Sequence, residues 1–362
     1  MDYWATSIKG RGALSNPAGR FETVSKVALT DEQGEGEPMV APVPVELPAT
    51  VVKAEPVRTI ISSNNSPDIP FRLSINPYRG CEHGCIYCYA RPSHGYLNLS
   101  AGLDFETRLF YKQGAAEALE QQLRRPGYRC EPITLGANTD PYQPVEKKLG
   151  ITRSLLQVMQ RYGQPVTIIT KSALVERDLD LLTAMAAEGL AQVMVSITSL
   201  SNEIKRTLEP RAASPAARLS AIGALAEAGV PVGVMAAPVI PAITDRELEL
   251  ILQRAAERGA SRAGYILLRL PHEVKDLFRE WLQAHYPMRA SHVMSLIRQS
   301  RGGRDYDSRF GVRMRGEGHF ADLIAHRFDL ACKRLGLNAA QIKLNQNRFI
   351  PPLHSGDQMD LF

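Results

Sequence analysis

Three cysteines stand close together in the first quarter of the chain, at Cys81, Cys85 and Cys88. Thiolates are ligands for soft metals and iron–sulfur clusters, and three of them within eight residues can surround one cluster. Gly80 and Gly84 allow the backbone of this loop to wrap closely around such a group. Three ligands leave one iron of a [4Fe-4S] cube without a protein ligand, so that iron is open to a substrate or a cofactor.

A zinc knuckle is the alternative for the same loop, with His83 as a fourth ligand. Structural zinc sites, however, normally use a second pair of ligands at a distance, and the remaining cysteines, Cys130 and Cys332, stand alone. We expect these two to be small core hydrophobes. The cysteine spacing therefore favours the iron–sulfur cluster, with Cys81, Cys85 and Cys88 as its ligands.

The segment NPYRGCEHGCIYCYARP, residues 76–92, resembles the CxxxCxxC loop of radical SAM enzymes. In that family the loop follows the first strand of a barrel and holds a [4Fe-4S] cluster whose free iron binds S-adenosylmethionine (SAM). Reductive cleavage of SAM then yields a 5′-deoxyadenosyl radical. The resemblance covers about residues 70–270. More narrowly, NPYRGCEHGCIYCYARPSHGYL and NTDPYQPVE resemble the spore-photoproduct-lyase-like branch, often described as DNA repair photolyases, which implies a lyase-type repair enzyme.

A pocket for SAM needs a cation, hydroxyl or amide groups and an apolar slot, and the ends of the expected strands offer such groups. The resemblance implies that Tyr87 lies against the adenine, that Tyr89 is on the cofactor side, and that Lys171 and Ser196 contact the carboxylate or the ribose. In the alternative, Lys171 pairs with a carboxylate at the rim, and Ser196 or Asn138 caps the next helix. The candidate cofactor-binding residues are Tyr87, Tyr89, Asn138, Asp140, Lys171 and Ser196.

One position departs from the branch that the chain resembles. Spore photoproduct lyases carry a cysteine directly before the Thr-Asp pair and use it to donate a hydrogen atom, whereas Asn138 stands there in this chain. An amide does not readily donate a hydrogen atom, and Cys130 is expected near the opposite face of the barrel. Reversal of spore photoproduct by that route is therefore disfavoured. A tyrosine such as Tyr89 or Tyr142 is an alternative donor, and no catalytic residue is assigned.

The elements that must position this loop alternate along the middle of the chain. Six strand-like runs alternate with helix-like runs, which predicts parallel strands joined by crossover helices in an α/β fold, best described as a partial (β/α)6 TIM-type barrel. We expect the site at the carboxyl ends of the strands. The expected strands cover residues 71–76, 132–138, 165–170, 191–197, 230–238 and 264–270.

The composition fits a folded enzyme with extensions. The chain has 362 residues, of which 44% are hydrophobic and 22% charged, and these values exclude a wholly disordered, collagen-like or coiled-coil protein. No run resembles a signal peptide or a membrane span, so we expect a cytoplasmic protein. The expected parts are an extended arm over 1–65, the radical SAM barrel over 66–275, a basic helical extension over 276–350 and a flexible tail over 351–362.

The extension and one turn carry further charged groups. Residues 298–315 contain six arginines with Tyr306 and Phe310 among them, which suits phosphate contact and base stacking. A solvated basic surface or a packing loop is equally plausible. Glu209-Pro210-Arg211 could supply an acid and a base, although an ion pair that precedes a helix is the favoured alternative.

The chain ends with Gln358, Met359, Asp360, Leu361 and Phe362, which resemble the Q-x-[S/D]-L-F peptide that docks on the bacterial replication sliding clamp. A terminus folded back on the domain is the alternative. The expected partners are thus DNA, the sliding clamp and an electron donor, with no membrane. An RNA or protein substrate, or a zinc-bearing nucleic-acid-binding protein without enzymatic chemistry, remains as an alternative function.

Overall fold

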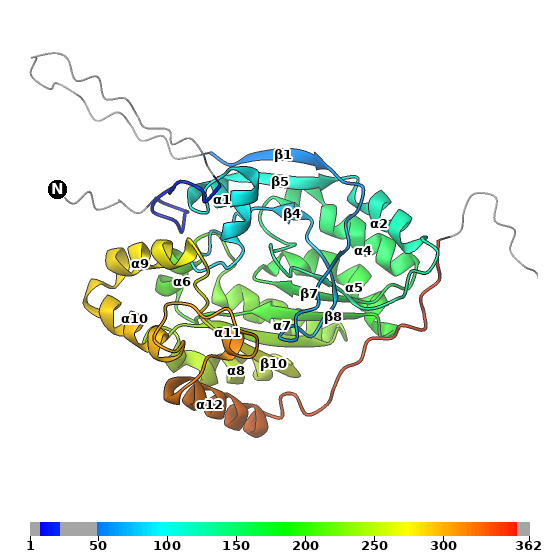
Figure 1. Ribbon diagram of the computed structural model, residues 1–362. Coiled ribbons are helices and arrows are strands. Elements are labelled where there is room, and N and C mark those ends of the chain that lie inside the picture. The colour runs from blue at the N-terminus through cyan, green and yellow to red at the C-terminus, as the bar shows by residue number, and fades with distance from the viewer. Residues whose placement is uncertain (1–7, 22–48, 353–362) are drawn as a thin grey trace, which may run out of the picture.

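A seven-stranded sheet forms the centre of the computed structural model, which describes residues 8–21 and 49–352. The strand order is β10-β9-β8-β7-β6-β3-β2, and every neighbouring pair is parallel except β2 and β3 (Figure 1). All six expected strands are present, which confirms the α/β barrel class. The strands of this sheet are β2 (Ser62–Ser63), β3 (Leu73–Ile75), β6 (Ile133–Leu135), β7 (Val166–Thr170), β8 (Ala191–Ser196), β9 (Val232–Val239) and β10 (Arg262–Leu267).

Helices supply the crossovers that parallel strands require. Strands such as β9 are apolar along most of their length because both of their faces are covered. Local signals set the helix ends, for example at α7, where Ser214 caps the helix by accepting from the Ala217 amide at 3.2 Å and Pro215 occupies its first turn. The crossover helices are α2 (Ala115–Leu123), α3 (Glu146–Leu149), α4 (Ile151–Arg161), α5 (Leu179–Ala187), α6 (Asn202–Leu208), α7 (Pro215–Glu227) and α8 (Leu248–Glu257), with the 3-10 turns η2 (Ala173–Asp178) and η3 (Asp245–Glu247).

A second, three-stranded sheet lies beside the barrel with the order β1-β5-β4. Its strands are β1 (Val51–Pro56), β5 (Arg108–Gln113) and β4 (Tyr78–Arg79). β1 falls within the residues expected to form an extended arm, and it pairs in parallel with β5. β4 immediately precedes the cysteine loop, which is followed by the 3-10 helix η1 (Arg91–Leu97) and by α1 (Leu103–Thr107). The small sheet therefore anchors the start of that loop.

The C-terminal part is helical, with α9 (Val274–His285), η4 (Pro287–Arg289), α10 (Ala290–Gln299), α11 (Val312–Arg315) and α12 (His319–Leu335). Beyond α12 the chain runs as an extended strap, residues 336–352, back across the molecule (Figure 1). Backbone hydrogen bonds join Asn345 to Gly189 and Ile350 to Tyr162, each at 2.9 Å. Because Gly189 and Tyr162 precede β8 and β7, the strap lies along the edge where the strands begin.

Among residues 8–21 and 49–352, no helix is long and apolar enough to cross a membrane.

Candidate functional site

The cysteine loop lies at the edge of the sheet where the parallel strands end. Cys81 and Cys85 are buried, Cys88 is half-buried, and all three are free thiols. Gly80 and Gly84 have φ values of +76° and +66°, in the left-handed region that favours glycine. A Cβ at Gly84 would meet the Glu106 carboxylate at 2.8 Å. The loop thus depends on its glycines, as the sequence predicted.

A buried arginine and a buried glutamate hold one side of this loop. Arg91 donates from Nε to the Cys85 carbonyl at 2.9 Å and forms an ion pair with Glu106, and neither side chain is exposed to solvent. Glu106 also accepts the backbone amides of Gly12 and Ala13 at 3.0 and 2.9 Å. The N-terminal segment 8–21 is therefore packed directly against the cysteine loop, a contact that the sequence did not predict.

Residues from two other elements hold the opposite side. Gln143 accepts the Glu82 amide at 2.9 Å, and His83 Nδ1 lies 3.4 Å from an oxygen of Asp140. Arg211 pairs with Glu82 at 3.0 Å and donates its backbone amide to the His83 carbonyl at 3.2 Å. The loop is therefore held by protein contacts on both sides.

Asp140 organises the ends of β6 and β7. Its carboxylate accepts from Thr170 Oγ1 and from the Lys171 amide, both at 2.7 Å. Burial by itself raises the pKa of Asp140, but His83 and these donors hold that pKa at about 2. Asp140 is thus an anion bonded within the protein, and it fixes the backbone that presents Lys171.

Tyr87, between the second and third cysteines, belongs to a buried polar network. Its hydroxyl donates to Glu209, which also accepts from Thr198 Oγ1 at 2.8 Å and pairs with Arg218. Burial raises the pKa of Glu209, whereas the positive charges of Arg218 and Lys171 lower it to about 2. The Lys171 ammonium lies 5.9 Å from the centre of the Tyr87 ring. Tyr87 and Lys171, two of the predicted residues, therefore lie together.

The other predicted residues lie around this pair. The Tyr89 hydroxyl donates to the Ala137 carbonyl, and the Asn138 amide that follows donates to Asn76 Oδ1 at 2.8 Å. Ser196 is buried at the end of β8, where its carbonyl accepts from Arg218 at 2.9 Å. All the candidate residues are thus at the carboxyl edge of the sheet.

The three thiols fit an iron–sulfur cluster by their chemistry. Burial raises the pKa of Cys81 and raises that of Cys85 to about 12. Thiols in such surroundings ionise when a metal centre supplies positive charge. No three His, Cys, Asp or Glu side chains of the described chain are grouped to hold a single metal ion. In a [4Fe-4S] cluster, by contrast, each thiolate binds a separate iron.

The residues of the Glu209-Pro210-Arg211 turn form ion pairs. This agrees with the interpretation that the sequence favoured, an ion pair that precedes a helix. Glu209 pairs with Arg218 of the following helix α7, and Arg211 pairs with Glu82. Sequence reasoning missed Arg218, Arg91 and the role of Glu106. The one available signal was Arg218 itself, a charged residue among the small and apolar residues of the segment that forms α7.

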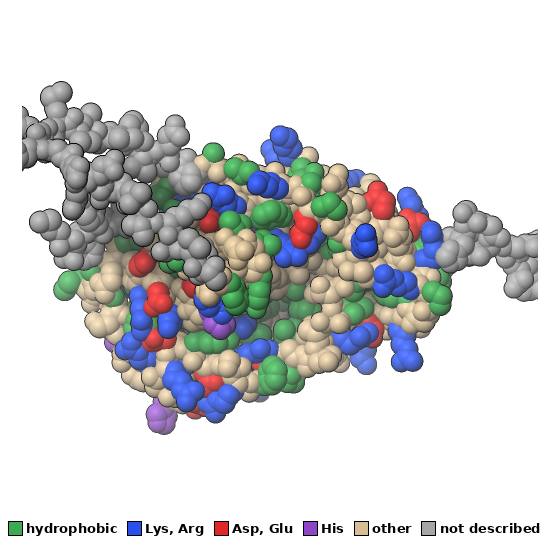
Figure 2. Space-filling model, turned by 45° about the horizontal axis from the view of Figure 1, so that its top comes forward, with side chains coloured by type: hydrophobic (Ala, Val, Ile, Leu, Met, Phe, Trp, Pro, Cys, Tyr) green, Lys and Arg blue, Asp and Glu red, His purple; other side chains and the backbone are tan. Residues whose placement is uncertain are grey.

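The arginine-rich segment 298–315 packs against the barrel. Arg301 is 1% exposed and donates to the Leu268 carbonyl at 2.9 Å, while Arg313 pairs with Asp68 at 2.5 Å. Arg298 and Arg309 pair with acidic residues of the same segment. In Figure 2 the Lys and Arg side chains are scattered among acidic ones rather than gathered into one patch. These contacts agree with the packing alternative.

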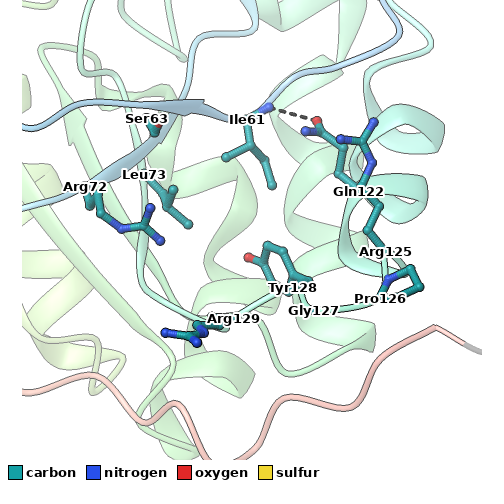
Figure 3. Close-up of a pocket in the computed structure, with 10 residues that line it drawn as sticks. All are labelled: Ile61, Ser63, Arg72, Leu73, Gln122, Arg125, Pro126, Gly127, Tyr128 and Arg129. Carbon is teal, nitrogen blue, oxygen red and sulfur yellow. Dashed lines mark hydrogen bonds between the residues drawn. The ribbon is translucent and has the colours of Figure 1, made fainter.

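A cavity of about 410 Å³ lies away from the cysteines (Figure 3). It is lined by Leu73, the first residue of β3, and by residues 125–129, which precede β6. It is therefore at the edge where strands begin, opposite the cysteine loop. Cys130 lies at this same edge, as expected, and bonds to Gln164 at 3.7 Å.

The sequence of this chain is similar to a known family and to proteins of several organisms. A family model described as the radical SAM superfamily matches residues 75–255. Uncharacterized proteins of Mycobacterium bovis and Mycobacterium tuberculosis are 37% identical to this chain over 237 residues, which is 65% of this chain and 70% of each relative. An uncharacterized protein of Methanocaldococcus jannaschii is 28% identical over 213 residues, covering 59% of this chain and 76% of the relative.

Solved structures share the fold. Spore photoproduct lyase complexed with dinucleoside spore photoproduct is 19% identical, with a TM-score of 0.56 over 79% of this chain and 80% of that one. A variant of that enzyme with bound AdoMet and dinucleoside spore photoproduct is 17% identical, with a TM-score of 0.53 over 80% of each chain.

Proposed function

The chain belongs to the radical SAM superfamily and is thus an enzyme whose cofactors are a [4Fe-4S] cluster and SAM, and we propose that its substrate is DNA, which it repairs or modifies. The observation that carries the choice of DNA is the fold shared with spore photoproduct lyase, which is solved with a dinucleoside lesion. The motifs around the cysteines and around Asp140 resemble the same branch. RNA or protein is the alternative substrate.

Cys81, Cys85 and Cys88 are the proposed cluster ligands. Their support is the donor chemistry of three free thiols on one loop that is fixed on both sides. When bound, the cluster and SAM supply a 5′-deoxyadenosyl radical.

Lys171 is the proposed partner of the SAM carboxylate. Burial by itself lowers the pKa of this lysine, but negative charge on the Cys85 sulfur and on the Glu209 carboxylate raises it, so the residue is a cation. Tyr87 keeps its ring beside Lys171 because Glu209 fixes the hydroxyl, and Asp140 holds the Lys171 backbone. Tyr89, Asn138 and Ser196 complete the proposed cofactor side.

Tyr89 is also the proposed source of a hydrogen atom. Asn138 occupies the position where spore photoproduct lyases have their donor cysteine. The Tyr89 hydroxyl donates to the carbonyl of Ala137, one residue before Asn138. It therefore lies next to the position from which that cysteine acts.

The substrate class is tested by 5′-deoxyadenosine formation. Anaerobically reconstituted protein, SAM and a reductant are incubated with irradiated DNA, undamaged DNA, RNA, a protein fraction or no addition. We expect DNA to stimulate 5′-deoxyadenosine formation and to be altered in mass. Stimulation by RNA alone, or by a protein fraction alone, would contradict the DNA proposal while leaving the family intact.

The C-terminal peptide from Gln358 to Phe362 is proposed to bind the replication sliding clamp. It lies outside the described residues, which end at residue 352. Near that end of the strap, the ring centres of Phe349 and Tyr128 are 5.3 Å apart. This contact lies at the edge of the sheet opposite the cysteine loop. A tether there leaves the cysteine side open to DNA and raises the local concentration of the enzyme on it. The free thiols and the proposed DNA and clamp partners support a cytoplasmic location. Because the cleavage of SAM is reductive, we also propose an electron donor as a partner.

A further inference from the structure

Arg269 joins the last strand of the barrel to the cysteine loop. It lies two residues beyond the end of β10, and its guanidinium is 4.9 Å from the centre of the Tyr89 ring. Tyr89 directly follows Cys88, the last cysteine of the loop. The arginine is thus at the carboxyl edge of the sheet, next to the proposed site.

The protein holds this guanidinium only weakly. One Nη lies 3.5 Å from Met314 Sδ and the other lies 3.4 Å from the Tyr306 hydroxyl, while Nε is buried without a hydrogen-bond partner. No carboxylate of the described chain forms an ion pair with Arg269. Guanidinium N–H groups pair best with planar arrays of anionic oxygens, and here they have none.

The acidic side chains of the surrounding segments are engaged elsewhere. Asp68 pairs with Arg313 at 2.5 Å and accepts the Gly311 amide at 2.6 Å. Asp307 and Glu317 both pair with Arg309, at 2.7 and 3.0 Å. Among the described residues, Asp68 therefore interacts with Arg269 only as a nearby charge and not as an ion-pair partner.

A second cation without an ion pair in the described chain lies beside the first. Arg301 is buried and donates to backbone carbonyls, among them that of Leu268, and it pairs with no carboxylate of the described chain. Burial, followed by the positive charge of Arg269, lowers the pKa of Arg301 to about 10. Two adjacent arginines that form no ion pair within the described chain make this part of the site attractive to an anion.

We propose that Arg269 binds a phosphate group of the nucleic-acid substrate, with Arg301 adding to the positive potential. The proposal rests on the proposed function and adds the group by which the substrate is held. The SAM carboxylate has the same anionic chemistry. Lys171, however, is available to that carboxylate beside Tyr87 and follows β7, three strands away from β10 in the sheet. The Arg269 end of the site is therefore left for the substrate.

Binding of a short oligothymidylate and of its uncharged methylphosphonate analogue tests this proposal. The Arg269→Gln variant removes the cation, and Arg304→Gln is the matched control because Arg304, on segment 298–315 close to Arg301 in the chain, is exposed and forms no ion pair within the described chain. All proteins carry the reconstituted cluster, and the Kd of SAM is measured in parallel. We expect Arg269→Gln to raise the Kd of the oligothymidylate about tenfold, because a charged multidentate contact is lost. The Kd of SAM, the Kd of the uncharged analogue and the behaviour of Arg304→Gln should not change.

Two other results would overturn the proposal that Arg269 binds a phosphate group. Equal oligothymidylate affinity in the wild type and in Arg269→Gln overturns the proposal, and so does a raised Kd for SAM, which would assign Arg269 to the cofactor. If Arg269→Gln does not fold, Arg269→Met removes the charge and keeps the length of the apolar stem. An Arg269→Met protein that binds the oligothymidylate as tightly as the wild type overturns the proposal.

Inorganic phosphate separates this inference from the choice of DNA. Phosphate binding by the wild type that is lost in Arg269→Gln, without any oligothymidylate binding, supports the anion site and contradicts the nucleic-acid substrate. If the oligothymidylate binds with the same Kd in the wild type and in Arg269→Gln, the anion site is contradicted and the proposed substrate class is not affected.

Discussion

At the scale of single residues, the proposed cluster ligands Cys81, Cys85 and Cys88 cannot replace one another, because in a [4Fe-4S] cluster each thiolate binds a different iron. Substitution of Cys81, Cys85 or Cys88 by alanine is expected to reduce the iron content from about four per chain to near zero and to abolish the brown colour. Iron analysis and the visible absorption spectrum measure this.

Cys130→Ala is the control for the cysteine variants. Cys130 precedes β6 at the opposite edge of the sheet, so this variant should keep its cluster. A loop variant that retains full iron would show that the ligands lie elsewhere.

Glu209 neutralises a buried arginine beside the site. Glu209→Gln leaves the charge of Arg218 buried and uncompensated, so the free energy of unfolding should fall by about 3–5 kcal/mol. Denaturant-induced unfolding measures the loss. Glu257→Gln is the control because Glu257 pairs with Arg254 at the surface, where an ion pair contributes at most about 1 kcal/mol. Equal losses in the two variants would mean that Glu209 is not needed to compensate Arg218.

Some residues of the site can be predicted from the sequence and others cannot. The cysteines are visible because their spacing is local and their chemistry is specific. The partners of Glu209 are not, because Tyr87, Thr198 and Arg218 come from three separate elements and meet only in the folded chain. The six arginines of segment 298–315 look like a nucleic-acid surface in sequence, yet three of them, Arg298, Arg309 and Arg313, pair with carboxylates that are distant in the chain, such as Asp68, or interspersed with them.

At the scale of elements, the parallel strands are predictable because burial on both faces leaves apolar runs. β1 is not, because its sequence, VVKAEP, is largely exposed and its pairing depends on β5, more than fifty residues away. The contact of segment 8–21 with the cysteine loop has no periodic signal either, since it consists of backbone amides bound to one buried glutamate.

The N-terminal segment is expected to stabilise the cysteine loop. A Cβ at Gly12 would lie 1.8 Å from the Gly84 carbonyl oxygen, so Gly12→Ala must displace the segment and remove two donors from Glu106. We expect the variant to lose its cluster several times faster in the presence of a chelator, as followed by absorbance.

Gly223→Ala is the matched control for Gly12→Ala. It adds a methyl group in α7 whose nearest neighbour is at an ordinary 3.8 Å. It should lose its cluster at the rate of the wild type. Equal rates in the Gly12 and Gly223 variants would show that the segment does not support the loop.

At the scale of the whole molecule, the cysteine loop and the end of the strap lie at opposite edges of the sheet (Figure 1). This separation implies that tail binding and cofactor chemistry are independent. Replacing Leu361 and Phe362 by alanine should abolish micromolar-range binding to the sliding clamp. Cluster content and SAM cleavage should stay at wild-type levels. Failure of both the intact protein and its isolated tail to bind the clamp at about 100 μM would contradict the tether.

Reductive cleavage of SAM by the anaerobically reconstituted protein is the most direct test of the central claim, that Cys81, Cys85 and Cys88 hold a cluster that works on SAM. The wild type is expected to carry about four irons per chain and to release 5′-deoxyadenosine when a reductant is added, whereas Cys88→Ala releases none. A colourless, zinc-loaded wild type that folds normally and yields no 5′-deoxyadenosine would contradict it.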